Sequence, residues 1–216
     1  MSGENYLSIA SKLKEKGVTL VAVSKTKPVE AILELYHLGQ REFGENYVQE
    51  LVSKYEQLPK DIRWHFIGNL QRNKVKYLAP FVHLIHSVDS EKLLKEIDKQ
   101  AAANNRMINC LLQIHIAQEE TKFGLSEAEA KAILQHSSFK HCSITGLMGM
   151  ATNTDDLIQV RKEFRQLTFF FNSEIRNLKS EILSMGMSSD YEIAIEEGSN
   201  MVRIGSLLFG ERVYQK

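Results

Sequence analysis

The stretch TLVAVSKTKPVEAILELYHL, residues 19–38, places a short apolar run, a polar turn and an amphipathic segment in direct succession. A short run of consecutive apolar residues is typical of a strand buried on both faces, and the spacing that follows it is helical. Lys25 stands directly after the apolar run. The stretch therefore predicts a strand, a turn and a helix, with a lysine at the carboxyl end of the strand.

The same succession recurs along the chain. Strand candidates lie at 19–24, 42–43, 64–67, 84–88, 111–116, 144–147, 182–185 and 201–204. Helix candidates lie between them at 29–38, 47–57, 90–104, 126–135 and 155–179, and an extra helix at 4–16 precedes the first strand. Eight alternating units predict an α/β protein whose parallel sheet closes into a single (β/α)₈ TIM barrel. A doubly wound open sheet is the alternative, because the sequence does not show whether the first and last strands pair.

Composition limits the classes of function. Lysine plus arginine and aspartate plus glutamate both number 27, so no overall charge attracts nucleic acid or an anionic membrane. No linker divides the 216 residues, which we expect to form one domain over 1–216 and a monomer. Cys110 and Cys142 lie in apolar runs typical of reduced core thiols, and the sequence has neither a signal peptide nor a membrane span. We therefore expect a cytoplasmic protein.

Barrel proteins place their sites at the carboxyl ends of the strands, so Lys25 is the first candidate. A lysine beside an apolar cavity is partly neutral, and its amine can then form a Schiff base with a carbonyl. Most lysines are solvated surface residues, and Lys27 has the same strand parity. Lys25 is preferred because it directly continues the apolar run, whereas Lys27 precedes Pro28 at the turn into a helix.

The last two strand candidates end in small polar residues. Gly186 and Ser188 follow the seventh, and Gly205 and Ser206 follow the eighth. Either pair alone could simply cap a helix, but together they match the phosphate site that TIM barrels form after these two strands. Arg203 lies inside the eighth strand, where a guanidinium pairs with a carboxylate or donates to a ring nitrogen. A lysine and a phosphate site together suggest pyridoxal phosphate.

Histidines and methionines in the strands are weaker candidates. His65, His83, His86 and His115 lack metal-ligand spacing, so we predict histidines of the core or rim and no metal. Methionine at a strand end, as at 148 and 150, is more often core packing than the wall of a pocket.

Three strings near the amino terminus are distinctive: AVSKTKP (22–28), FGENYVQE (43–50) and WHFIG (64–68). Near the carboxyl terminus stands the pattern of SMGMS (184–188), GS (198–199), VRIG (202–205) and FG (209–210). Together they resemble the pyridoxal phosphate homeostasis protein family. The resemblance spans nearly the whole chain. It implies a barrel like the amino-terminal domain of alanine racemase, with Lys25 holding the cofactor as a Schiff base and Arg203 facing the pyridine nitrogen. It further implies that the phosphate is held by Ser188, Gly205 and Ser206, and that the cavity is lined by Asn46, His65 and Met148.

The resemblance also implies a function. The family is thought to bind, protect and deliver pyridoxal 5′-phosphate to PLP-dependent apo-enzymes, and so to maintain vitamin B6 and amino-acid and keto-acid pools. Strong catalysis is not expected, because no second domain supplies an opposing acid or base and an unprotonated pyridine is a poor electron sink. One departure is Asn200, where the family usually has threonine. The alternatives are a low-activity fold-type III enzyme, either a racemase or a decarboxylase, and a barrel enzyme that acts on a sugar phosphate.

Overall fold

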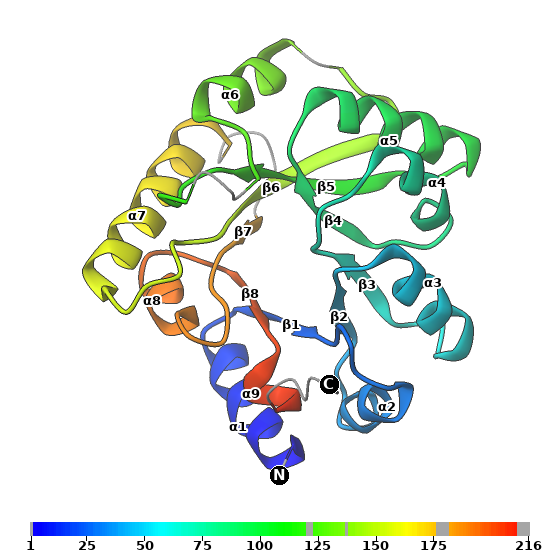
Figure 1. Ribbon diagram of the computed structural model, residues 1–216, viewed down its shortest axis with the longest axis vertical. Coiled ribbons are helices and arrows are strands. Elements are labelled where there is room, and N and C mark those ends of the chain that lie inside the picture. The colour runs from blue at the N-terminus through cyan, green and yellow to red at the C-terminus, as the bar shows by residue number, and fades with distance from the viewer. Residues whose placement is uncertain (1, 120–122, 137, 176–181, 211–216) are drawn as a thin grey trace.

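The computed structural model describes residues 2–119, 123–136, 138–175 and 182–210. Eight strands form a closed parallel barrel in chain order (Figure 1). They are β1 (Thr19–Val23), β2 (Glu42–Glu45), β3 (Arg63–Phe66), β4 (Leu84–Val88), β5 (Ile108–Ile114), β6 (Cys142–Gly149), β7 (Ile182–Ser184) and β8 (Met201–Ile204). Because β1 pairs with both β2 and β8, the barrel is confirmed and the open sheet is excluded.

Helices surround the barrel and connect its strands (Figure 1). The described helices are α1 (Ser2–Glu15), α2 (Val29–His37), α3 (Val48–Gln57), η1 (Arg72–Lys74), α4 (Val75–Leu78), α5 (Glu91–Ala103), α6 (Glu127–His136), α7 (Leu157–Glu174), α8 (Tyr191–Glu196) and α9 (Ser206–Phe209). The extra helix before the first strand is α1. No helix of the described chain is both long and apolar enough to cross a membrane.

Side-chain caps fix where several helices begin. The Ser90 hydroxyl accepts a hydrogen bond from the Leu93 amide at the start of α5. Asp156 accepts from the amides of Ile158 and Gln159 at the start of α7. Ser126 and Glu129 form the reciprocal capping box at α6, with the Ser126 amide donating to the Glu129 carboxylate. The helix starts predicted at 90 and 126 are thus confirmed, with Ser90 and Ser126 as the capping residues.

The strand predictions differ from the structure mainly in length. The fifth strand begins at Ile108 instead of 111, and the sixth spans Cys142–Gly149 instead of 144–147. The long helix predicted at 155–179 is α7, which ends at Glu174. Positions 176–179 of that prediction lie outside the described residues.

Two hydrophobic layers hold the fold together. The larger lies between the strands and the helices, with Phe43, Trp64, Phe66 and Phe164 fully buried in it. A smaller layer fills the barrel itself and is formed by Val21, Leu84, Leu111, Met148 and Met201. The inner layer makes the barrel a packed core, so a ligand site must lie above it, at the end of the strands.

Candidate functional site

A cavity of about 450 Å³ opens at the carboxyl ends of β1 and β8. Six of the residues predicted from the sequence line it: Lys25, Asn46, Ser188, Arg203, Gly205 and Ser206. The other lining residues are Val23, Lys27, Ile67, Met150, Met187, Ser189, Leu207 and Gly210. All charged side chains among these described residues are cationic, so the cavity suits an anionic ligand.

Two predicted residues are not brought to this cavity. Met148 is fully buried and packs in the inner layer of the barrel. His65 is also buried, and its ring contacts Glu42 and His86 instead. Both side chains have the inward parity of the strand but lie one level deeper than the cavity. Met150, two residues after Met148, lines the cavity in its place.

The turn that carries Lys25 has an unusual backbone. Thr26 has a φ of 63°, a left-handed conformation that is uncommon for a residue with a branched side chain. The Lys27 amide donates to the Ser24 carbonyl at 3.0 Å, and the Thr26 amide donates to the Glu50 carboxylate at 2.6 Å. These contacts fix a tight turn directly after β1, so the partly buried Lys25 side chain is presented at the cavity.

A buried ion pair underlies this turn. The Lys54 ammonium on α3 donates to Glu45 at 2.8 Å, to Glu50 at 2.6 Å and to the Ser24 carbonyl at 2.8 Å. The Ser24 hydroxyl also donates to Glu45, at 2.6 Å. Burial raises the pKa of Glu45 to about 6, although Lys54 and Ser24 act in the opposite direction. Glu45 and Lys54 therefore connect α3 to the residue that precedes Lys25.

Lys27 also lines the cavity, but its ammonium is engaged elsewhere. It donates to the carbonyls of Phe209 and Gly210, at 2.9 and 3.2 Å. These two contacts join the turn after β1 to the end of α9.

Arg203 forms the floor of the cavity. Its guanidinium donates to the carbonyl and hydroxyl oxygens of Ser184, at 2.8 and 2.7 Å, and to the Gly149 carbonyl at 3.0 Å. All three partners are neutral. Burial lowers the pKa of Arg203 to about 10, with Asp190 acting in the opposite direction. The side chain is therefore positively charged at neutral pH and has no carboxylate within the hydrogen bonds described.

The two small polar segments predicted from the sequence meet at the cavity. The Gly205 amide donates to the Ser188 hydroxyl at 3.3 Å. The loop containing Ser188 is held by Asp190, whose carboxylate accepts from the Met187 amide at 2.6 Å. Ser206, the first residue of α9, lines the same wall. Backbone amides and hydroxyls therefore converge from the ends of β7 and β8, as a phosphate group requires.

Asn200 takes a structural role at the start of β8. Its side-chain oxygen accepts a hydrogen bond from the Leu183 amide at 2.9 Å, and its backbone amide donates to the Leu183 carbonyl at 3.2 Å. The residue that departs from the family pattern thus joins β7 to β8, away from the cavity lining.

Asn46 offers an unused hydrogen-bond acceptor in the wall of the cavity. Its side-chain oxygen is buried and has no hydrogen-bond partner among the described residues. The backbone there is closely approached by Gly68, where a Cβ would lie 2.2 Å from the Asn46 carbonyl oxygen. An unpartnered buried acceptor beside a cationic cavity fits a polar ligand that donates a hydrogen bond to it.

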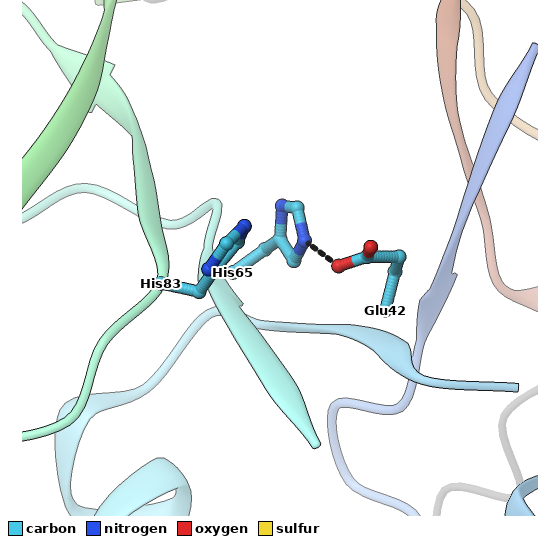
Figure 2. Close-up of side chains that lie close together, drawn as sticks. All are labelled: Glu42, His65 and His83. Atoms are coloured by element: carbon cyan, nitrogen blue, oxygen red, sulfur yellow. Dashed lines mark hydrogen bonds and ion pairs between the residues drawn. The ribbon is translucent and has the colours of Figure 1, made fainter. Parts of the chain in front are cut away.

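Glu42, His65 and His83 form a second polar cluster (Figure 2), with ligand-type atoms within 4.8 Å of one another. His65 Nε2 lies 2.7 Å from the Glu42 carboxylate, and His65 Nδ1 lies 2.8 Å from His86. Arg63 pairs with the same carboxylate. Both imidazole nitrogens of His65 are therefore engaged, and a guanidinium lies beside the Glu42 carboxylate.

Sequence reasoning missed several parts of the site. Ile67 and Leu207 line the cavity, yet an apolar residue at a strand end or in a short helix carries no signal of a ligand. Glu45, in contrast, did carry a signal in the sequence. It shares the parity of Phe43, so its charge falls on the buried outer face of β2 and requires a partner, which is Lys54.

The family model described as "Alanine racemase, N-terminal domain" matches residues 3–213. The chain is 44% identical over 204 residues to the pyridoxal phosphate homeostasis protein of Aquifex aeolicus, covering 93% of this chain and 90% of that protein. It is 40% identical over 213 residues to the protein of that name from Homo sapiens, covering 91% and 78%.

Solved structures agree. PipY of Synechococcus elongatus PCC7942 with PLP bound superposes with a TM-score of 0.89 at 36% identity, covering 97% of this chain and all of that one. An alanine racemase of Clostridium difficile 630, at 12% identity and a TM-score of 0.79 over 97% of this chain and 57% of that one, shares the fold. The cationic cavity, the barrel and these similarities agree, and the chain belongs to the pyridoxal phosphate homeostasis protein family.

Proposed function

We propose that this protein binds pyridoxal 5′-phosphate in the cavity at the carboxyl end of the barrel, protects it, and delivers it to PLP-dependent apo-enzymes. The observation that carries the proposal is the arrangement of Lys25, Arg203 and the Ser188–Gly205 contact around one cavity with only cationic charged groups. The relatives named for pyridoxal phosphate homeostasis and the PLP-bound PipY structure support the same ligand.

Each residue has a distinct role in the proposal. Lys25 forms the Schiff base, because it lies in the turn directly after β1 and its side chain lines the cavity. Ser188, Gly205 and Ser206 hold the phosphate. Asn46, directly after β2, supplies an acceptor to the ligand. The residues present therefore fit an anionic ring aldehyde.

Arg203 sets the chemistry of the site. It faces the pyridine nitrogen in the proposal, and a guanidinium that remains charged leaves that nitrogen without a proton. When bound, the cofactor supplies a reactive aldehyde and an electron sink, and an unprotonated ring is a poor sink. We therefore expect a cytoplasmic, monomeric carrier with no strong catalytic activity.

The function is tested by delivery in the presence of a phosphatase that destroys free pyridoxal phosphate. The loaded protein is mixed with a PLP-dependent apo-enzyme, and the recovery of that enzyme's activity is measured. We expect recovery with the loaded protein and none with an equal amount of free cofactor. Equal loss in both mixtures would contradict the carrier function, and turnover of an amino acid by the protein alone would favour a fold-type III enzyme.

A further inference from the structure

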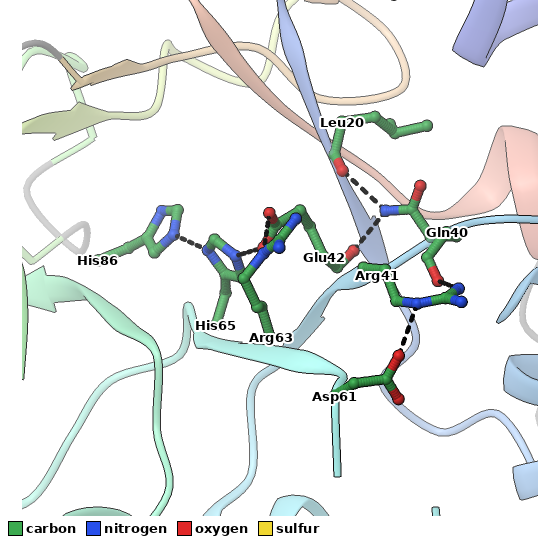
Figure 3. A network of polar contacts seen from close by, with 8 residues as sticks. All are labelled: Leu20, Gln40, Arg41, Glu42, Asp61, Arg63, His65 and His86. Carbon is green, nitrogen blue, oxygen red and sulfur yellow. Dashed lines mark hydrogen bonds and ion pairs between the residues drawn. The ribbon is translucent and has the colours of Figure 1, made fainter. Parts of the chain in front are cut away.

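A continuous series of buried polar side chains leads away from Arg203 into the barrel. Ser184 Oγ, which accepts from the guanidinium, lies 3.2 Å from His86 Nδ1. His86 Nε2 lies 2.8 Å from His65 Nδ1, and His65 Nε2 lies 2.7 Å from Glu42. Figure 3 shows the part of this series farthest from Arg203, from His86 through His65 to Glu42, with Arg63 beside it. We call Glu42, His65, His86 and Ser184 the barrel array.

The barrel array joins the two ends of the barrel. Arg203 lines the cavity at the carboxyl ends of the strands. Glu42 and Arg63 line a second hollow of about 380 Å³, together with Thr19 and Leu20 at the start of β1. Ser184 and His86 are fully buried, and His65 is 1% exposed. The array is therefore a shielded polar path through an otherwise apolar core.

Hydrogen-bond chemistry fixes which atom donates at each contact of the array. An ionised Glu42 only accepts, so His65 donates to it through Nε2–H and, when neutral, must accept at Nδ1. His86 then donates through Nε2–H and accepts at Nδ1 from the Ser184 hydroxyl. Ser184 in turn accepts from Arg203. Every donor is satisfied, and the Ser184 hydroxyl is held with its lone pairs toward the guanidinium.

Several charged groups act on the array. His86 faces His65, His83 and Arg203, and burial together with these groups lowers the pKa of His86 well below its ordinary value. Burial raises the pKa of Glu42, but hydrogen bonds from His65 and Arg63 hold that pKa below its ordinary value overall. Asp190 acts on Arg203 from the other side. The array thus has an ionised carboxylate at one end and contacts a guanidinium at the other, with two imidazoles and a hydroxyl between them.

We propose that the barrel array is a positioning device for Arg203, and that it passes the protonation state of Glu42 and His65 to the cofactor cavity. The inference rests on the proposed function. A proton added to His65 must reverse the His86 tautomer, because His65 Nδ1–H then donates to His86. His86 Nδ1–H then donates to Ser184, so the hydroxyl turns away from its former direction. The Ser184 hydroxyl thus helps to orient the Arg203 guanidinium, and the direction of that hydroxyl is set by the protonation state at the far end of the barrel.

The test compares variants along the array that differ in their distance from the cavity. Ser184→Ala removes the hydroxyl that Arg203 uses, and Ser184→Thr retains it. Glu42→Gln removes the charge at the far end, outside the lining of the cavity. His37→Asn is the control, since His37 is an exposed histidine at the end of α2, outside both the array and the cavity lining. Circular dichroism establishes that each variant is folded.

Two readouts separate positioning from a merely structural role. The first is the pH dependence of the visible absorption of bound pyridoxal phosphate. The second is affinity for pyridoxine 5′-phosphate, which has the same ring and phosphate but no aldehyde, and therefore binds independently of a Schiff base. We expect Ser184→Ala to weaken the affinity for pyridoxine 5′-phosphate by about tenfold, as for the loss of one hydrogen bond to a charged group. We expect Ser184→Thr to retain most of that affinity.

Glu42→Gln provides the decisive result. We expect Glu42→Gln to shift the pH profile of the absorption while leaving affinity near that of the wild type, and we expect His37→Asn to change neither. Profiles of Glu42→Gln and Ser184→Ala that match the wild type would overturn the inference while leaving the proposed function intact. Failure of the wild-type protein to bind either compound would instead contradict the proposed function.

Discussion

Lys54 and Glu45 form an ion pair of 2.8 Å beneath α3, and the same ammonium holds the carbonyl of the residue before Lys25. Glu45 is fully buried and Lys54 is 5% exposed, so the pair lies inside the wall of the barrel. Buried pairs are costly unless their remaining groups are hydrogen-bonded. Here the additional partners are Ser24 and Glu50, which both contact the turn.

Replacing Lys54 should therefore destabilise the protein strongly. Lys54→Met leaves Glu45 buried without its counter-ion, and breaking such a pair typically costs about 3–5 kcal/mol. The free energy of unfolding, measured by denaturant titration, should fall by that amount. The double variant Glu45→Gln/Lys54→Met should recover most of the loss, because no fully buried charge then remains unpaired; Glu50, the other partner of Lys54, is partly exposed. A double variant as unstable as the single one would show that packing, not charge, is responsible.

The pKa of Glu45 predicts a pH dependence of stability. This pKa is raised from 4.5 in the unfolded chain to about 6, so the folded state binds a proton that the unfolded state releases. The contribution is fully present below pH 4.5 and is lost as pH rises through about 6. Relative to Glu45→Gln, the wild type should lose roughly 2 kcal/mol of stability across this window. Parallel stability curves for the two proteins between pH 4 and 7, within about 0.5 kcal/mol, would rule out this assignment.

The barrel and most of the cavity could be predicted from the sequence because their signals are local. An apolar run followed by Lys25, and glycine with serine after the last two strands, depend only on neighbouring residues. Once β7 and β8 pair, Ser188 and Gly205 must meet. The fold therefore brings together residues that the sequence shows separately.

The placement of the other site residues depends on their level within the barrel and on the residues that they contact from other elements. Met148 and Met150 have the same parity, so only the stagger of the barrel decides which one reaches the cavity. His65 has inward parity too, but it lies at the level of the barrel array. Lys54 lies in a helix like any solvated lysine, and its burial follows only from the position of Glu45 across the interface. Such relationships are not visible in a single sequence.

Gly68 should be sensitive to the smallest substitution. A Cβ at this position would lie 2.2 Å from the Asn46 carbonyl oxygen, which is backbone and cannot yield cheaply. We expect Gly68→Ala to displace Asn46, to weaken pyridoxal phosphate binding at least several-fold, and to destabilise the protein by roughly 1–3 kcal/mol.

The matched control for Gly68 is Gly3 in α1, where a Cβ would make an ordinary contact of 3.5 Å with a Leu38 side-chain carbon. Gly3→Ala should leave binding unchanged and raise stability slightly, by roughly 0.5–1 kcal/mol. Calorimetric titration with pyridoxal phosphate and thermal unfolding measure both effects. Equal binding by the two variants would refute the role given to the close approach at Gly68.

Lys27 should stabilise the wall of the cavity and should not form the covalent bond with the cofactor. Its ammonium holds the carbonyls of Phe209 and Gly210. Lys27→Met should therefore destabilise the protein by roughly 1–3 kcal/mol, the range for hydrogen bonds that involve a charged group. It should still form the Schiff base, as judged by the visible absorption of the loaded variant. Loss of that absorption with the fold intact would assign the reactive amine to Lys27.

The most direct test of the account is borohydride reduction of the loaded protein followed by peptide mass mapping, with Lys25→Ala and Lys27→Met treated alongside. Reduction makes the bond between the cofactor and its lysine permanent, so the modified residue can be identified. We predict a single pyridoxyl group on Lys25 in the wild type and in Lys27→Met, and none in Lys25→Ala. A pyridoxyl group on Lys27, or groups scattered over surface lysines, would contradict the central claim.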